Sequence, residues 1–441
     1  MKVRDRRGVF GLLTAVGMSL LGTRMSFLAV PWFVLATTGS PTKTGLVAFA
    51  EMAPYVLVQG LGGPLVDRWG AWRISISTDV LAAIAVGLVP VLYAMGLLTL
   101  PIMAGLVAVA GVVRGGGDAA RDVLVPGVGE AAGMPLERSA GLYDGVNRLA
   151  SLIGAPVAGV LIAVTSSLTV LAIDAATFLV SALVVLALVP RSAQPPMSAE
   201  TDEGDVSYLG SLAQGFRFVR GDRLLMGIGS MVLITNLVDA AGGTVLNPVW
   251  AIQVAHSSVA LGLMGGALAG GAVLGNIITT WLGPRLPRRL TYGVGFLLAG
   301  APRFVMMAFA ATVSPVLVVT FLAGLGAGGI NPILGAVLYE RVPRHLQARV
   351  LGAVGAAGWA GIPVGGLAAG ALVAAFGLRP ALLIAAAVYL PTTLAPFIFP
   401  AWRGMDRKPA SDDIPDNVAA EAAEDGDIPD NVACGAVTQD R

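Results

Sequence analysis

Apolar stretches of about twenty residues recur from one end of this 441-residue chain to the other. A helix of that length, at about 1.5 Å per residue, spans the roughly 30 Å hydrocarbon core of a bilayer. Because the core holds no water for backbone groups, only helices or closed barrels cross it, and these stretches lack the alternation of barrel strands. Charged residues make up only 12% of the chain. The sequence therefore predicts an all-α membrane protein.

Loop-like breaks divide the chain into twelve predicted transmembrane helices. Their expected ranges are 8–36, 44–66, 74–97, 101–124, 140–164, 167–189, 223–252, 258–283, 289–312, 314–338, 348–375 and 378–400. The first follows a basic start, but its apolar run is too long for a signal-peptide core, so we interpret it as a transmembrane helix.

The longest internal polar stretch separates six predicted helices from six. We therefore expect an N-terminal six-helix bundle over 1–190, a cytoplasmic linker over 191–222 and a C-terminal six-helix bundle over 223–400. The remaining residues, 401–441, repeat DIPDNVA and have little apolar content, which predicts a disordered cytoplasmic tail.

The basic residues indicate how the helices are oriented. Only Lys43 and Arg379 lie in or beside the odd-numbered loops, whereas the even-numbered loops and both termini are rich in Lys and Arg. Basic residues near span ends are retained on the cytoplasmic side. Both termini are therefore predicted to be cytoplasmic.

Several kinds of chemistry have no support in the sequence. Cys434 is the only cysteine, and His256 and His345 are about ninety residues apart, so we expect no disulfide framework, metal site or cofactor. A net charge of +1 does not indicate nucleic-acid binding. No Gly-x-x-x-x-Gly-Lys-Ser/Thr loop supports a primary pump, and no intramembrane catalytic constellation supports an enzyme.

A pattern of glycine and proline occurs twice. The fifth predicted span contains Gly145, Gly154, Pro156 and Gly159, and the same spacing recurs over residues 352–366 of the eleventh. Such small residues let membrane helices approach closely, and proline lets them bend. A weaker match links the first and seventh spans. The halves are therefore predicted to be structural repeats, an arrangement in which the substrate site lies at the midplane between them.

The loop after the second span, residues 63–73, has the sequence GPLVDRWGAWR. It resembles the signature loop of the major facilitator superfamily, and the span-five pattern resembles that superfamily's antiporter motif, although Ala155 replaces a usual glycine. The stretches VPW at 30–32 and ARDVLVP at 120–126 are most similar to its Tap and macrolide-efflux branch of drug:proton antiporters. The resemblance covers almost the whole chain.

This resemblance implies a monomeric, proton-coupled exporter of small amphiphilic molecules in the bacterial cytoplasmic membrane, working by alternating access. It implies a gating loop made by Gly63, Asp67, Arg68, Gly70 and Arg73. Asp67 is expected to cap or pair with neighbouring helix ends, forming a latch that breaks as the halves rock. The second-half loop at 283–289 has bases but no acid, so we expect any latch to be asymmetric.

Ionisable residues inside a span are costly and need a partner, a wet cavity or a proton-carrying role. The candidates for proton coupling are Asp144, Arg148, Asp239, Glu51, Arg114 and Asp118. Asp144 and Arg148 are four residues apart on one helix face, and Asp144 is the first candidate for the proton carrier; the alternative is a carboxylate at the cytoplasmic end. Arg114 and Asp118 repeat this spacing. Structural roles are expected for Asp174 and Arg303.

A substrate cavity between the halves is the last predicted site. Its candidate lining residues are Arg24, Phe27, Trp32, Met52, Tyr55, Met231, Asn236, Asn247, Asn331 and Trp359. Arg24 and Glu51 form a candidate pair across adjacent helices. Adaptable Met and aromatic surfaces suit varied amphiphiles, although such residues also serve simple packing.

Two other functions fit the same fold. One is the export of a dedicated metabolite such as a siderophore, and the other is nutrient symport. A membrane receptor or membrane-embedded enzyme is disfavoured because the predicted extramembrane loops are too short for a sensor domain.

Overall fold

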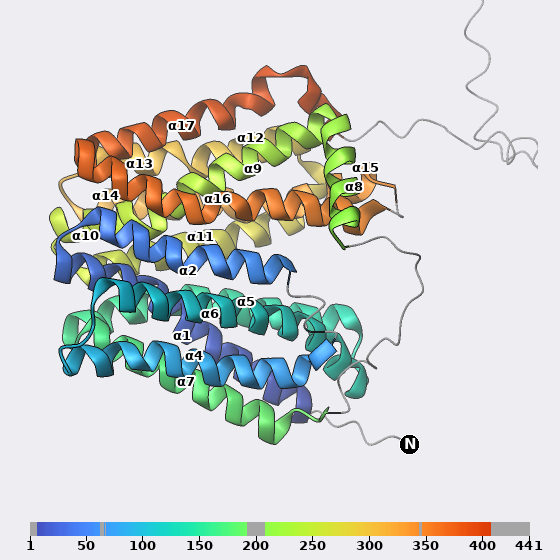
Figure 1. Cartoon of the computed structure of the whole chain (residues 1–441). Helices are drawn as coiled ribbons and strands as arrows, with labels where there is room; N and C mark the ends of the chain where they lie inside the picture. The colour runs from blue at the N-terminus through green and yellow to red at the C-terminus, as the bar shows by residue number, and fades with distance from the viewer. Residues whose placement is uncertain (1–6, 62–65, 67, 192–207, 344–345, 407–441) are drawn as a thin grey trace, which may run out of the picture.

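The computed structural model describes residues 7–61, 66, 68–191, 208–343 and 346–406, and nearly all of these residues are helical (Figure 1). Twelve helical segments in this part of the chain are long and apolar enough to cross a membrane. Their ends lie within several residues of the predicted ones. The predicted all-α membrane fold of twelve transmembrane helices is therefore confirmed.

Six long helices build the first half. They are α1 (Arg7–Thr38), α2 (Pro41–Leu61), α4 (Ala71–Ala94), α5 (Leu100–Ala131), α6 (Leu136–Val164) and α7 (Ser167–Leu188). Within this half α1 packs against α6 and α7, α2 packs against α5, and α4 packs against α5 and α7.

The second half has more interrupted helices. They are α9 (Arg223–Ala241), which continues through a π-helical turn η2 (Gly242–Leu246) into α10 (Asn247–Gln253), then α11 (Ser258–Leu282), α12 (Arg288–Ala299), α13 (Ala301–Phe309), α14 (Val313–Gly328), α15 (Ile330–Arg341), α16 (Gln347–Phe376) and α17 (Leu378–Ile398). The ninth span breaks at Gly300, where the ring of Tyr389 occupies the space that a Cβ would need.

A further helix, α8 (Tyr208–Gly221), lies across one end of the bundle, roughly perpendicular to the spans (Figure 1). We call this the α8 end, and the opposite one the far end. Arg349 of α16 donates to Gln214 Oε1 at 2.5 Å, and the Arg349 carbonyl lies where a Cβ on Gly215 would be. Part of the predicted linker is therefore a helix docked on α16.

The predicted disordered tail begins too early. Residues Pro400–Met405 form a 3-10 helix in which Trp402 and Met405 are buried. The Trp402 ring packs 5.9 Å from the ring of Tyr292 and covers Gly227, so these apolar side chains hold the segment against α9 and α12. Residues 407–441 lie outside the described part of the chain.

Two seams join the halves, one between α2 and α16 and the other between α6 and α11. Near the far end the backbones approach so closely that only glycine fits. A Cβ on Gly45 would collide with the Gly366 carbonyl, and one on Gly159 would lie 2.6 Å from the Ser258 carbonyl. Small residues thus bring the two halves together at the far end, as they do at other membrane helix interfaces.

Candidate functional site

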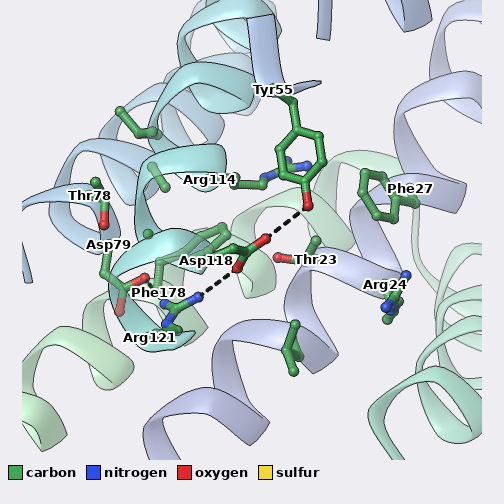
Figure 2. Close-up of a pocket in the computed structure, with 14 residues that line it drawn as sticks. Thr23, Arg24, Phe27, Tyr55, Thr78, Asp79, Arg114, Asp118, Arg121 and Phe178 are labelled. Atoms are coloured by element: carbon green, nitrogen blue, oxygen red, sulfur yellow. Dashed lines mark hydrogen bonds and ion pairs between the residues drawn. The ribbon is translucent and has the colours of Figure 1, made fainter. Parts of the chain in front are cut away.

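A polar pocket lies in the middle of the first half, with a volume of about 50 Å³. Its labelled side chains come from α1, α2, α4, α5 and α7 (Figure 2). The polar or aromatic lining residues are Thr23, Arg24, Phe27, Tyr55, Thr78, Asp79, Arg114, Asp118, Arg121 and Phe178. The pocket has room for one or two water molecules beside several charged groups.

Glu51 and Arg114 form a buried ion pair beside this pocket. Arg114 Nη1 donates to Glu51 Oε1 at 2.5 Å, and both side chains are almost fully buried. A Cβ on Gly111 would collide with the Glu51 carbonyl, so this glycine lets α2 and α5 come close enough for the pair to form. The guanidinium also lies over the Phe27 ring, 5.4 Å from its centroid.

This geometry corrects two predicted pairings. Arg24 does not meet Glu51, because its Nη2 donates to Asn147 Oδ1 of α6 at 3.1 Å. Arg114 does not pair with Asp118, although the two share a helix face, because its guanidinium reaches across to Glu51. A side chain can therefore pair with a residue on a neighbouring helix instead of with the residue four positions away on its own helix.

Asp118 lies at the junction of two helices and a second arginine. Tyr55 Oη donates to Asp118 Oδ2 at 3.0 Å, and Arg121 Nη1 donates to Oδ1 at 3.3 Å (Figure 2). The Asp118 side chain is 25% exposed, whereas that of Arg121 is buried. Asp118 is therefore a membrane-embedded carboxylate with access to the pocket.

Arg121 extends this network to α4 and α1. Its Nη2 bonds with Asp79 and also donates to Ser19 Oγ at 3.0 Å. The other oxygen of Asp79 accepts from Ser181 Oγ at 2.6 Å. Sequence reasoning missed Asp79 and Arg121, although each lies inside a predicted span. The criterion that selected Arg114, a charge within an apolar segment, would have found both.

Asp144 and Arg148 form the expected ion pair, with Arg148 Nε 2.7 Å from Asp144 Oδ2. The Asp144 side chain is 57% exposed, in contrast to the buried carboxylates of Glu51 and Asp79. The residue is the ninth of α6 and lies in the half of this helix toward the α8 end.

The antiporter-like pattern packs against two different helices. A Cβ on Gly154 would lie 2.6 Å from Cβ of Arg24 in α1. Pro156 and Gly159 instead face Gly266 and Gly262 of α11. A Cβ on Gly145 would meet no atom within 4 Å. Three of the four predicted motif residues thus mark close helix contacts.

The second half holds one comparable group. Arg303 pairs with Asp239, and Tyr389 Oη donates to the other Asp239 oxygen at 3.4 Å. The Asp239 side chain is 41% exposed. Asn236, one turn earlier, donates to the Gly358 carbonyl at 2.9 Å and so ties α9 to α16 rather than pairing with the acid.

Asp174 of α7 is fully buried and accepts hydrogen bonds from Ser26 and Thr177. These contacts join α7 to α1, in keeping with the structural role expected for this residue.

The structure separates the predicted cavity residues. Arg24, Phe27 and Tyr55 line the polar pocket, and the Tyr55 ring lies 5.9 Å from the ring of Trp359 in the other half. Met231 was expected in the cavity but is buried in the core of the second half. Trp32, Met52, Asn236 and Asn247 are half-buried, and Asn331 is exposed.

Gly63 and Asp67 of the predicted gating loop lie outside the described residues. Arg68 and Arg73 are exposed, and Gly70 adopts a φ of 84° directly before α4, a conformation that favours glycine. Trp72 anchors this region, since its Nε1 donates to the Val189 carbonyl at 2.9 Å.

The second-half loop obtains an acid from another helix. Glu340 at the end of α15 accepts both Nη atoms of Arg288, at 2.5 and 2.6 Å. A loop that has bases but no acid of its own is therefore paired through Glu340.

Comparisons with known proteins agree over most of the chain. The family model of the Major Facilitator Superfamily matches residues 12–238 and 232–423. The multidrug efflux pump Tap of Mycobacterium tuberculosis is 32% identical, covering 93% of this chain and 98% of that protein. The Tap pump of Mycolicibacterium fortuitum is 27% identical, covering 90% and 96%.

Solved structures share the fold at low sequence identity. The nucleoside transporter NupG superposes with a TM-score of 0.71 at 15% identity, covering 90% of this chain and all of that one. A bacterial homolog of the human lysosomal transporter Spinster, in an inward-facing and unoccupied conformation, superposes with a TM-score of 0.69 at 14% identity, covering 93% and 100%.

Proposed function

The chain belongs to the major facilitator superfamily, and we propose that it exports small amphiphilic, drug-like molecules in exchange for protons. The observation that carries the proposal is the similarity over 93% of the chain to the multidrug efflux pump Tap. Adaptable aromatic surfaces such as the Tyr55 and Trp359 pair suit varied cargo. The function of the protein would be transport rather than catalysis.

We place the α8 end in the cytoplasm of a bacterial cell and expect a monomer in the cytoplasmic membrane. The distribution of basic residues supports this orientation. In that frame the glycine contacts at the far end would close the outward side, and the described conformation would be one of the two states that alternating access requires. Proton binding would shift the equilibrium between them.

Asp118 is the proton carrier that we propose from among the six candidates. It lies within a span, its side chain is partly exposed to the pocket, and it contacts both Arg121 and Tyr55. A proton on Asp118 would weaken its pairing with Arg121 within α5 and would alter the hydrogen bond from Tyr55 that joins α2 to α5. Asp144 is less suited, because its side chain is 57% exposed and its partner Arg148 lies on the same helix.

Proteoliposomes with an imposed pH gradient test this assignment. Asp118→Asn is expected to abolish accumulation of a lipophilic cationic dye against its gradient while downhill movement continues. Asp144→Asn, a matched loss of one carboxylate, is expected to retain uphill transport. The reverse result would return the carrier role to Asp144, and loss of downhill movement by a folded Asp118→Asn protein would point to binding instead.

A further inference from the structure

Helix α8 packs on the second half through one of its sides. Gly215 meets the backbone of Arg349 in α16, and Val219 joins the core of the second half. With about 100° between successive residues, Arg217 and Arg220 lie on the opposite side. Both are exposed, and neither forms an ion pair with any residue that the structure describes. This side of α8 is therefore an exposed basic surface.

Two further residues extend this surface. Phe216 lies at its edge and is 42% exposed. Arg223, at the start of α9, is exposed and also has no acidic partner within the described part of the chain. We call Arg217, Arg220, Arg223 and Phe216 the basic face of α8. A fitting occupant would combine several negative charges with a few apolar side chains.

The sequence of this chain contains such a segment. Residues 409–439 include eight acidic residues and no basic one. The heptapeptide DIPDNVA occurs twice there, at 413–419 and 427–433. Each copy places two Asp three positions apart and carries one Ile and one Val. In charge and in apolar content the repeats therefore match the basic face of α8.

The structure brings the start of this segment close to α8. The last described residue, Asp406, follows the 3-10 helix that packs against α9 and α12. A Cβ on Gly404 would lie 3.1 Å from Arg341 Nη1, and Nε of the same arginine donates to Asp222 Oδ2 at 2.6 Å. Asp222 directly follows α8. A single guanidinium group thus separates Gly404 from the end of α8.

Two hollows on the surface lead from Asp406 toward α8. One, of about 600 Å³, is lined by Arg288, Arg341 and residues 404–406 among others. The other, of about 660 Å³, is lined by Arg341, residues 221–224 and residues 399–401. Because Arg341 borders both hollows, they adjoin each other between the end of the described chain and the basic face of α8.

The length of chain is also sufficient. The first repeat begins seven residues after Asp406, a stretch that spans up to about 25 Å when extended. Helix α8 has 14 residues and is about 21 Å long. The first repeat can therefore reach the basic face, and the second repeat, further along the chain, can reach it too.

We propose that the basic face of α8 is a docking site for the DIPDNVA repeats of the same chain. The Asp side chains would pair with the arginines, and Ile or Val would cover Phe216. Because the repeats are tethered to the same molecule, their effective concentration is of the order of millimolar, so weak contacts are enough. Two copies within reach of one surface raise this concentration further.

An anionic membrane is the competing occupant of a basic helix. Helices that bind the membrane interface present a large apolar face to the bilayer. In α8 the apolar side chains of Phe218 and Val219 instead pack against the core of the second half. Among its described side chains, Phe216 is the only large apolar one that is exposed. The charge and the short tether favour the repeats.

Docking can be measured as a distance in the full chain. Cys434 is the only native cysteine and directly follows the second repeat. Ala213→Cys adds a second cysteine on the exposed side of α8. Nitroxide labels on both are measured by double electron-electron resonance in phosphatidylcholine nanodiscs at low ionic strength. A distinct short-distance component, of the order of the 21 Å length of α8, is expected.

Three changes should abolish the short-distance component. The first is Arg217→Gln combined with Arg220→Gln, which removes charge from the basic face. The second is an ionic strength raised from about 0.01 M to about 1 M, which shortens the screening length from about 30 Å to about 3 Å. The third replaces Asp by Asn in both repeats, at Asp413, Asp416, Asp427 and Asp430, and does not alter any described helix.

A matched control removes two exposed arginines from the α8 end of the first half. Arg73→Gln combined with Arg138→Gln should leave the component unchanged. The proposal is overturned if no short component forms at low ionic strength, if it survives the loss of Arg217 and Arg220, or if the control removes it equally. Its loss in nanodiscs that contain phosphatidylglycerol would assign the basic face to the anionic membrane instead, and would also overturn the proposal.

Discussion

The two halves of the molecule build their cores differently. In the first half the buried apolar residues form two clusters, one around Val16 and Leu124 and the other around Phe33 and Phe178. The polar network that includes Asp79 and the pocket separates them. In the second half one continuous cluster runs through the bundle, and it is rich in large aromatic side chains.

This difference indicates where titratable chemistry is placed. The first half can hold a polar layer because its charges are paired across α2, α4 and α5, through Glu51 with Arg114 and through Arg121 with both Asp79 and Asp118. Among the residues that the structure describes, the second half holds a single membrane-embedded pair, Asp239 with Arg303. The paired membrane-embedded charges of the described residues thus lie mostly in the first half, which is where we propose that protons act.

The largest effect on stability is expected when one buried charge loses its partner. Arg114→Met is expected to destabilise the protein by about 3–5 kcal/mol, because Glu51 would then keep an uncompensated buried charge. Arg303→Met should cost less, since Asp239 would keep the hydrogen bond from Tyr389 and its side chain is 41% exposed. Thermal unfolding in detergent measures both.

A double variant separates charge from packing. Glu51→Leu combined with Arg114→Met should recover much of the lost stability, because replacing both members of a buried pair by apolar groups is often neutral. If Arg114→Met and the double variant lose the same amount of stability, the pair acts through its shape alone. If Arg114→Met and Arg303→Met lose the same amount of stability, the two halves do not differ in how strongly they depend on their ion pairs.

The next test uses two tyrosines that each donate to a membrane-embedded acid. Tyr55→Phe keeps the ring beside Trp359 but removes the 3.0 Å bond to Asp118, and it should lower the number of protons exchanged per molecule exported. Tyr389→Phe removes a bond of 3.4 Å to Asp239 and should leave that ratio unchanged. The ratio follows from the reversal potential of transport in proteoliposomes. A fall in the ratio for Tyr389→Phe alone would assign coupling to the second half.

Much of the fold is readable from the sequence, whereas the pairing of charges is not. Hydropathy depends on composition along one helix, so all twelve spans were predicted to within several residues. The partner of Arg114 depends instead on how closely α2 approaches α5, and that distance is set by Gly111, whose neighbour on α2 no local pattern reveals. Asp144 illustrates the same limit, because its burial depends on depth in the assembled bundle.

The smallest effect concerns the N-terminal caps of one helix in each half. Asp222 caps α9 by accepting the N–H groups of Leu224 and Leu225, and it also accepts Arg341 Nε at 2.6 Å. Burial alone would raise the pKa of Asp222, but these hydrogen bonds hold the pKa below its usual value. In the first half Ser166 caps α7 by accepting the N–H of Thr169.

Substitution of either cap by alanine should cost about 1 kcal/mol near neutral pH. Because the folded pKa of Asp222 is lowered, its stabilisation is complete above the unfolded pKa of about 3.9 and is lost as pH falls through the folded value. The cost of Asp222→Ala should therefore shrink in acid, whereas that of Ser166→Ala stays constant, because a hydroxyl does not titrate there. Unfolding temperatures between neutral and acidic pH measure this difference. A constant cost for Asp222→Ala would mean that the Arg341 contact adds nothing to the cap.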